Sequence, residues 1–468
     1  MRSKDGRSVK VRGAACGIDL GTTNSAVAVV GEDGVPSLVR FEESAAIPSI
    51  LVVSSDCKLA HSSSSSAKRH CLFAFKRYIG REFASLSSDE ASQMPFSVDA
   101  DPSSDGTLLS TRGCSFSPDE ASRVMLQHLI SVAESSSNLS IDRAVVGVPA
   151  HFTESQREST RDAALAAGLT SVQLLREPVA AALAYSVDVQ DDQTVLVVDL
   201  GGGTFDVSVL EVGGGAVEVL SHSGDSRLGG TDFDWAIASM LARKARHSEE
   251  RPASLLQVAR HAREALSSNE EAGVFINEKR LVSKRDLEQA SDRATLLRDV
   301  VRVSNDELER ECSDLLNRMS GPIEEAALAS GIELGIVQDL GGEQSWGEKR
   351  NVDEVLLVGG ATRMRAVQRF VSSLSGTDAS LGEEVEPEAV VAVGAALRAA
   401  TLQGFDTGLE SYEPLQAELM RQIAKSRIER GELQPKEEQL VDEEDSVLMD
   451  EEYVIEDEDE GRTMYGFE

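Results

Sequence analysis

The sequence has few cysteines and no long hydrophobic run. Only five of its 468 residues are cysteines, they are widely scattered, and no two form a CxxC pair. This usage is typical of a reducing compartment, and it predicts reduced, mostly buried thiols with neither a disulfide framework nor a zinc site. No stretch approaches the roughly 18 apolar residues of a membrane span, so we expect no membrane partner.

Positive charge is also scarce. The chain has 46 Lys and Arg against 80 Asp and Glu, a formal net charge of −34. Such a surface repels nucleic-acid phosphates, so we expect no nucleic-acid partner. Residues 1–16 form an N-terminal extension that is basic but lacks an apolar core, which excludes a secretory signal. It is either the stub of a transit peptide or a loose end.

The remaining composition is that of an ordinary globular protein, and the length allows two to four domains. Apolar runs alternate with amphipathic stretches from residue 17 to 404, which predicts an α/β architecture. Expected strands are VAVV, AVVGVP, TVLVVDL and EVLLVGG, and expected helices cover 118–135, 154–167 and 305–329. Leucine spacing predicts a helical extension over 405–431, and an acidic tail that resists compaction follows over 432–468.

An internal repeat indicates two related lobes. IDLGTTNSAVAVV begins at Ile18 and VDLGGGTFDVSVL begins at Val198, at a constant offset that pairs Asp19 with Asp199. Each copy reads as strand, tight polar turn and strand, which is a β-hairpin. We therefore expect two lobes that meet near residue 198 and present their turns to a shared cleft.

Both turns suit the phosphates of a nucleotide. Glycine lets backbone N–H groups approach phosphate oxygens, and threonine hydroxyls add further donors. Two carboxylates at the strand ends would repel each other and any phosphate unless a divalent cation lay between them, and Mg²⁺ is the natural choice. The residues concerned are Asp19, Gly21, Thr22 and Thr23 in the first copy and Asp199, Gly201, Gly202, Gly203 and Thr204 in the second.

Two further glycine pairs precede expected helices. Gly359 and Gly360 end a strand in VLLVGGATR, and Gly229 and Gly230 lie in DSRLGGTDFD. A ligand resting on such a turn lies near a helix N-terminus, although a plain strand-to-helix turn explains each pair equally well. The sequence contains neither GxxxxGK[ST] nor a GxGxxG that opens a helix after a strand, which excludes the common phosphate-binding loops.

Six motifs together resemble the 70-kDa heat-shock chaperones. They are GIDLGTTNS, VGVPAHFTESQR, LLREPVAAALAY, VVDLGGGTFDVSVLEV, GDSRLGGTDFD and VLLVGGATR, in the order of that family, and Asn24 is typical of its bacterial and plastid branch. The resemblance covers residues 17–404 and implies a two-lobed actin-like ATPase fold with ribonuclease-H-like duplicated lobes. It also implies slow hydrolysis of ATP to ADP with Mg²⁺, in the chloroplast stroma or alternatively the cytoplasm.

The resemblance assigns roles residue by residue. Lys76 in FKRYIGREF would approach the γ-phosphate, although a lone lysine is usually a solvated surface residue. Glu177 would hold a water on the metal or assist the attack, although a carboxylate at a helix N-terminus is also favoured by the dipole. The implied catalytic residues are Lys76, Glu177, Asp199, Thr204 and Asp206, the metal residues are Asp19, Asp199 and Glu177, and the nucleotide-binding residues are Gly21, Thr22, Thr23, Gly201, Gly202, Gly203, Thr204, Gly229, Gly230, Arg263, Ser267, Gly359, Gly360 and Arg363.

The chain departs from the family pattern in two places. Glu264 stands where the family has an arginine that stacks on adenine, so we expect weaker nucleotide binding. No counterpart of the family's peptide-binding domain is expected after residue 404. Two functions therefore remain open: a slowly hydrolysing, chaperone-like switch that acts on a protein partner through tail 432–468, or a catalytically weak ATP-binding component of an assembly. The apolar segment DSVLMD (445–450) is either a patch in the tail or a docking segment.

Overall fold

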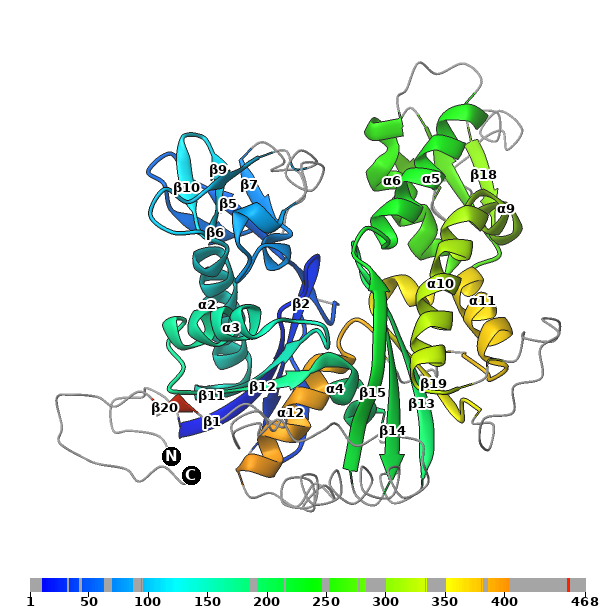
Figure 1. The fold of residues 1–468 in the computed structure, drawn as a ribbon. Helices are drawn as coiled ribbons and strands as arrows, with labels where there is room; N and C mark the ends of the chain where they lie inside the picture. The colour runs from blue at the N-terminus through cyan, green and yellow to red at the C-terminus, as the bar shows by residue number, and fades with distance from the viewer. Residues whose placement is uncertain are drawn as a thin grey trace, which may run out of the picture. The chain divides into compact units, whose positions relative to one another are not determined.

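The structure is a computed structural model with a mixed α/β architecture (Figure 1). It describes residues 11–31, 33–41, 44–62, 70–86, 94, 96–185, 192–213, 216–245, 252–276, 278–282, 300–332, 334, 351–379, 381, 386–403 and 453–454. The chain divides into two compact units, one of Met1–Gln190, Gly214–Val217 and Ala389–Glu468 and one of Asp191–Gly213 and Glu218–Glu388. The helical extension predicted over 405–431, nearly all of the acidic tail and DSVLMD lie outside the described residues.

The first unit is built on a mixed sheet in which β1, β11 and β12 run parallel to one another. Strand β1 pairs antiparallel with β2 and parallel with β11, and β11 pairs parallel with β12. The path of the sheet is β20-β12-β11-β1-β2-β3, and β4 pairs with β2. The strands are β1 (Val11–Asp19), β2 (Asn24–Val30), β3 (Pro36–Leu38), β4 (Ile47–Pro48), β11 (Leu139–Val148), β12 (Ser171–Arg176) and β20 (Tyr453–Val454).

Helices pack on this sheet where the sequence supplies caps and small residues. Helices α2 (Pro118–Ser137) and α3 (Glu154–Ala166) each begin with a capping box, at Ser117 and Thr153, which satisfies their first backbone N–H groups. Helix α12 (Val390–Leu402) packs on β1 and on α4 (Glu177–Ala184). The approach is close, because a Cβ added at Gly17 of β1 would overlap the backbone of Ala396.

Two three-stranded sheets complete the first unit, and a disulfide links them. One has the order β6-β5-β7 and the other β10-β9-β8. Cys57, in the turn after β5, is bonded to Cys114 at the start of β10, so the prediction that all thiols are reduced is wrong for this pair. Cys16, Cys71 and Cys312 are not in disulfides and are buried, as predicted. The elements are β5 (Ile50–Val53), β6 (Leu59–His61), β7 (Cys71–Phe73), η2 (Phe75–Arg77), η3 (Phe83–Ser85), β8 (Ser97–Ala100), β9 (Thr107–Thr111) and β10 (Cys114–Phe116).

A stacked histidine pair predicts that acid destabilises this unit. The rings of His61 in β6 and His128 in α2 lie 4.1 Å apart and 16° from parallel. Burial lowers the pKa of both histidines, and the charge of His61 lowers the pKa of His128 further. The hydrogen bond between His61 Nε2 and the Pro48 carbonyl partly opposes the shift of His61. The unfolded chain therefore binds protons first, and the free energy of unfolding should fall as the pH drops below the unfolded value of about 6.5.

We expect only a modest loss, because both histidines are half-buried. Urea unfolding between pH 7.5 and 5 measures it. His128→Phe keeps an aromatic ring in the stack and removes its titration, so this variant should have a flatter profile. An unchanged profile would show that the pair contributes nothing to the pH dependence.

The second unit repeats the arrangement of the first sheet with different surroundings. Strand β13 pairs antiparallel with β14 and parallel with β19, in the sheet β15-β14-β13-β19. A smaller sheet has the order β17-β16-β18. The strands are β13 (Gln193–Leu200), β14 (Phe205–Gly213), β15 (Ala216–Asp225), β16 (Glu271–Phe275), β17 (Arg280–Leu281), β18 (Val300–Ser304) and β19 (Glu354–Val358), and the helices are α5 (Gly230–Lys244), α6 (Pro252–Leu266), α9 (Asn305–Glu311), α10 (Ser313–Ala329), η4 (Gly360–Arg363) and α11 (Arg365–Ser375).

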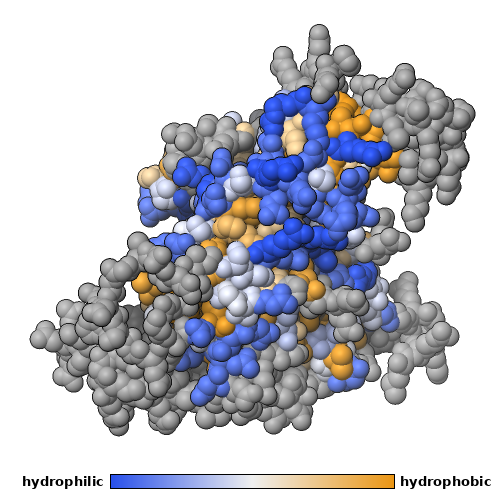
Figure 2. Space-filling view, turned by 90° about the vertical axis from the view of Figure 1, so that its right-hand side faces the viewer, coloured by the Kyte–Doolittle hydropathy of each residue, from blue (hydrophilic) through white to orange (hydrophobic). Residues whose placement is uncertain are grey.

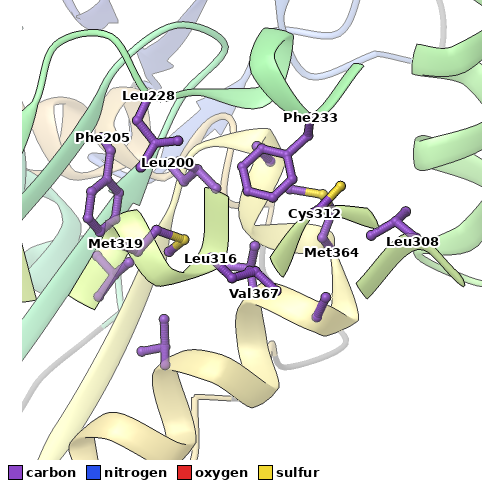
Figure 3. Close-up of a cluster of buried hydrophobic side chains, with 14 of the residues drawn as sticks. Leu200, Phe205, Leu228, Phe233, Leu308, Cys312, Leu316, Met319, Met364 and Val367 are labelled. Atoms are coloured by element: carbon purple, nitrogen blue, oxygen red, sulfur yellow. The ribbon is translucent and has the colours of Figure 1, made fainter. Parts of the chain in front are cut away.

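The core of the second unit draws helices from distant parts of the chain together. Figure 3 shows Phe233 from α5 beside Cys312 and Met364, and all three are buried. Cys312 separates α9 from α10, so the single helix predicted over 305–329 is two helices.

Hydrophilic residues cover much of the face in Figure 2, with hydrophobic residues visible between them. No helix in the described part of the chain is long and apolar enough to cross a membrane.

The two copies of the internal repeat are confirmed as hairpins in matching register. Asp19 ends β1 opposite Ala26 of β2, and Asp199 lies in β13 opposite Asp206 of β14. Each first strand also has a parallel neighbour, which is β11 for β1 and β19 for β13. The constant offset in the sequence therefore corresponds to an equivalent place in each sheet.

Candidate functional site

The turn of the first hairpin is held by two serines that the sequence did not single out. Gly21 donates its backbone N–H to Ser25 Oγ at 3.1 Å, and Ser49 Oγ donates to the Gly21 carbonyl at 2.7 Å. The two hydroxyls lie 2.8 Å apart. Thr22 and Thr23 follow in the same half-buried turn. The turn is thus fixed by side chains from β2 and from the segment after β4.

Lys76 is buried and paired. It lies in η2, directly after Ala74, whose φ of 53° is in the left-handed region. Its Nζ donates to Glu177 Oε1 at 2.7 Å, and the side chains are only 7% and 12% exposed. The same Nζ lies 5.8 Å from the centre of the Phe152 ring. Burial with a carboxylate partner rules out a solvated surface lysine.

A second carboxylate lies within the field of this pair. Burial and, to a smaller extent, the charge of Glu177 raise the pKa of Asp19 to about 7, although the charge of Lys76 opposes both effects. Glu177 begins α4, where the helix dipole favours a negative charge. Asp19, at the end of β1, thus lies in the electrostatic field of the Lys76–Glu177 pair.

Asp19 and Glu177 offer carboxylate oxygens of the kind that Mg²⁺ takes, and the metal role predicted for Asp19, Asp199 and Glu177 stays a prediction. Mg²⁺ is bound in nucleotide sites by one or two carboxylates, the phosphates and several waters. Among the described residues, no three or more His, Cys, Asp or Glu side chains gather closely enough to hold a metal by themselves. A cation beside Asp19 would favour its charged form, which burial disfavours. Two carboxylate donors, Asp19 and Glu177, suit a cation that retains water and phosphate ligands.

The second turn is held against the N-terminus of α5. Gly201 donates its N–H to the Thr204 carbonyl at 3.1 Å, which closes the turn. Gly230 donates to the Gly201 carbonyl, and Thr231 donates from its N–H and its hydroxyl to the Gly202 carbonyl, at 2.7–2.9 Å. Gly229, whose N–H is capped by the Asp232 carboxylate, precedes the helix. The predicted glycine pair at 229–230 is therefore a partner of the second turn.

The third glycine turn, at Gly359 and Gly360, lies next to the second turn. Gly359 has a φ of +83°, and a Cβ there would lie 2.7 Å from Asp199 Oδ1. Only glycine fits such a backbone conformation and such a close approach without strain. Gly360 begins η4, and a Cβ on Gly230 would lie 3.2 Å from Ala361 and 3.5 Å from the Arg263 guanidinium. In the second unit the turns at 201–204, 229–230 and 359–360 therefore lie together.

Three arginines of the second unit form ion pairs with acidic side chains. Arg263 Nε donates to Asp234 Oδ1 at 2.7 Å, and both side chains are at most 10% exposed. Arg363 forms two hydrogen bonds with Glu388, at 2.9 and 3.0 Å. The pair of Arg260 and Glu264 is exposed on α6. Asp234 ends the motif GDSRLGGTDFD, but neither it nor Glu388 was identified as a partner, because they lie 29 and 25 positions from their arginines. Ser267 Oγ lies 3.4 Å from the Arg263 carbonyl, on the same helix.

Comparison with known families decides the identity. The family model described as Hsp70 protein matches residues 15–444. The chain belongs to the Hsp70 family. Similar curated relatives are Chaperone protein DnaK 1 of Synechococcus sp., 37% identical over 381 residues, 78% of this chain and 47% of the relative, and Chaperone protein DnaK of Thermus thermophilus, 36% identical over 377 residues, 78% and 57%. The chain spans about half the length of the curated relatives it matches.

The resemblance seen in the sequence is confirmed at the level of the Hsp70 family. Within each unit the structure also brings predicted site residues together. Asp19, Lys76 and Glu177 interact in the first unit, and the second turn, both glycine pairs and Arg263 are neighbours in the second. The roles of these residues in this Hsp70-family chain stay predictions.

Proposed function

We propose that this chain binds ATP with Mg²⁺ on an actin-like, duplicated ATPase fold and hydrolyses it slowly. The observation that carries the proposal is the buried pair of Lys76 and Glu177 beside Asp19. Burying three charged groups costs free energy, so their retention beside a glycine turn favours a catalytic purpose. Membership of the Hsp70 family supports the same activity.

The proposed chemistry is attack of water on the γ-phosphate, in which positioning and charge stabilisation do most of the work. Lys76 would offset the charge that develops on the phosphoryl oxygens. Thr22 and Thr204 would donate to phosphate oxygens, while Glu177, Asp199 and Asp206 would orient water. Mg²⁺ would neutralise phosphate charge when it is bound.

The proposed role of this turnover is a nucleotide-dependent switch on a protein partner. The curated relatives are named as chaperones, which supports a protein as the partner. We propose the acidic tail 432–468 as the contact, because its charge would suit a basic surface. We propose the chloroplast stroma, or alternatively the cytoplasm, as the compartment. Only the motif around Asn24 supports this proposal.

Single-turnover hydrolysis of labelled ATP with Mg²⁺ tests the activity. Slow release of phosphate by the wild type is the expected result. ATP that binds but stays intact over hours would instead make the chain a nucleotide-stabilised component of an assembly. Absence of binding would overturn both functions.

Glu264→Arg should tighten ATP binding by roughly 2- to 30-fold, the range of a guanidinium stacked on an aromatic ring. Glu264 is exposed and its pair with Arg260 contributes little to stability, so the fold should tolerate the change. Titration calorimetry measures the affinity. Glu271→Arg, another exposed acid at the start of β16, is the matched control and should change the affinity little. Equal affinities for Glu264→Arg and the wild type would show that this position does not face the base.

A further inference from the structure

The disulfide joins an exposed cysteine to a buried one. Cys57 is exposed, whereas Cys114 is only 6% exposed. The two residues are 57 positions apart in the chain, with Cα atoms 5.6 Å apart, an ordinary distance for a disulfide. A reductant can therefore approach this bond from one side, at Cys57.

The turn that carries Cys57 would suit glycine better than cysteine. Cys57 has a φ of 58°, in the left-handed region, and donates its N–H to the Ser54 carbonyl at 3.2 Å. Ser54 also exchanges hydrogen bonds with the backbone of Lys58, which closes the turn. Most side chains are disfavoured at this backbone conformation. The turn itself therefore does not favour a cysteine at this position.

The bridge joins the sheet whose last strand leads to Lys76 to a neighbouring sheet. It links the turn between β5 and β6 to β10, and so ties sheet β6-β5-β7 to sheet β10-β9-β8. Strand β7 leads through Ala74 and Phe75 to Lys76. The rings of Phe73 in β7 and Phe96 before β8 also meet edge to face, with ring centres 5.5 Å apart. Lys76 thus follows the far end of a strand whose neighbour, β5, leads into the bridged turn.

We propose that Cys57–Cys114 is a reversible redox site that a dithiol protein reductant opens, and that opening it slows hydrolysis by loosening the support of Lys76. The second half rests on the proposed ATPase function, whereas the first half does not. A protein of the thioredoxin class, with two vicinal thiols near a neutral pKa, has the required chemistry.

The exchange balances in two steps. A thiolate of the reductant attacks Cys57 Sγ, a mixed disulfide forms, and Cys114 leaves as a thiolate that takes up a proton. The second thiol of the reductant then attacks the other reductant sulfur, which is bonded to Cys57 in the mixed disulfide. Cys57 is released as a thiolate that takes up a proton. The two electrons come from the dithiol, which ends as a disulfide. Oxidation by a protein disulfide runs the same steps in reverse.

The three cysteines outside the disulfide do not compete for this exchange. Cys16, Cys71 and Cys312 are all buried. Burial raises the pKa of Cys16 and Cys312 to about 12 and raises that of Cys71 as well. Because the thiolate is the nucleophile, these thiols are poorly reactive at neutral pH.

The redox site is tested on the full chain without any activity assay. The oxidised protein is titrated with dithiothreitol under native conditions, alkylated with a maleimide and weighed by mass spectrometry. Two labels should appear together, at Cys57 and Cys114, and the wild type without reductant should carry neither. Labelling of both cysteines in the oxidised protein, or a bond that native dithiol cannot open, would overturn the site.

The coupling to Lys76 is tested by single-turnover hydrolysis. The reduced wild type should cleave ATP about 3- to 10-fold more slowly than the oxidised form, with unchanged ATP affinity, as expected for misplaced positioning groups. Cys57→Gly suits the left-handed turn and removes the bond, so it should be slow with or without reductant, and Cys114→Ser should behave alike. Equal rates in both redox states would overturn the coupling. If the oxidised protein binds ATP but never cleaves it, the ATPase proposal and the coupling both fail, while the labelling result stands.

Discussion

Lys76→Ala should lower single-turnover hydrolysis by about 100-fold or more while ATP still binds. Removing one group that stabilises transition-state charge has costs of this size in other enzymes. Lys76 is placed to act in this way because its ammonium group is buried and held 2.7 Å from Glu177. Rapid-quench measurement of labelled phosphate gives the rate, and equilibrium titration of a fluorescent nucleotide gives the affinity.

The control for this prediction is a lysine of the same unit that lies in water. Lys58, 79% exposed and paired with Asp56, should tolerate Lys58→Ala with an unchanged rate. A thermal melt of Lys76→Ala detects unfolding, because the substitution leaves Glu177 buried without its cation. A folded Lys76→Ala protein that hydrolyses ATP at the wild-type rate would remove Lys76 from the mechanism.

The hairpins could be predicted because their signals are local. Alternating apolar residues before and after a glycine turn are enough to place β1–β2 and β13–β14, and the shared offset relates Asp19 to Asp199. The capping boxes at Ser117 and Thr153 likewise place the starts of α2 and α3. These elements depend on neighbours in the sequence.

The features that the sequence did not predict depend on distant residues. The partner of Lys76 lies 101 positions away, and that of Cys57 lies 57 positions away without any CxxC spacing. The break at Cys312 has no glycine or proline beside it, and the residue is fully buried in the core with Phe233. Lys76 itself was found only through a family motif, because one lysine carries no signal of its own.

Arg263→Met should lower the free energy of unfolding by about 3–5 kcal/mol, the usual cost of breaking a buried ion pair from one side. The substitution would leave Asp234 without the cation 2.7 Å away. Burial already raises the pKa of Asp234, and Arg263 is the largest opposing influence. Urea unfolding measures the loss. Arg260→Met, which breaks the exposed pair with Glu264, is the matched control and should cost at most about 1 kcal/mol.

The double variant Arg263→Met/Asp234→Leu separates the two roles that Arg263 can have. Replacing a buried ion pair by apolar side chains of similar volume is often neutral for stability, so the double variant should fold nearly as stably as the wild type. Because Arg263 lies beside Gly230 and the second turn, we expect Arg263→Met to bind ATP more weakly than the wild type. We expect the same low affinity in the folded double variant. If affinity returns together with stability, Arg263 supports the pocket through Asp234 without contacting the nucleotide. Affinity that stays low at restored stability assigns Arg263 to the nucleotide itself, as the sequence predicts.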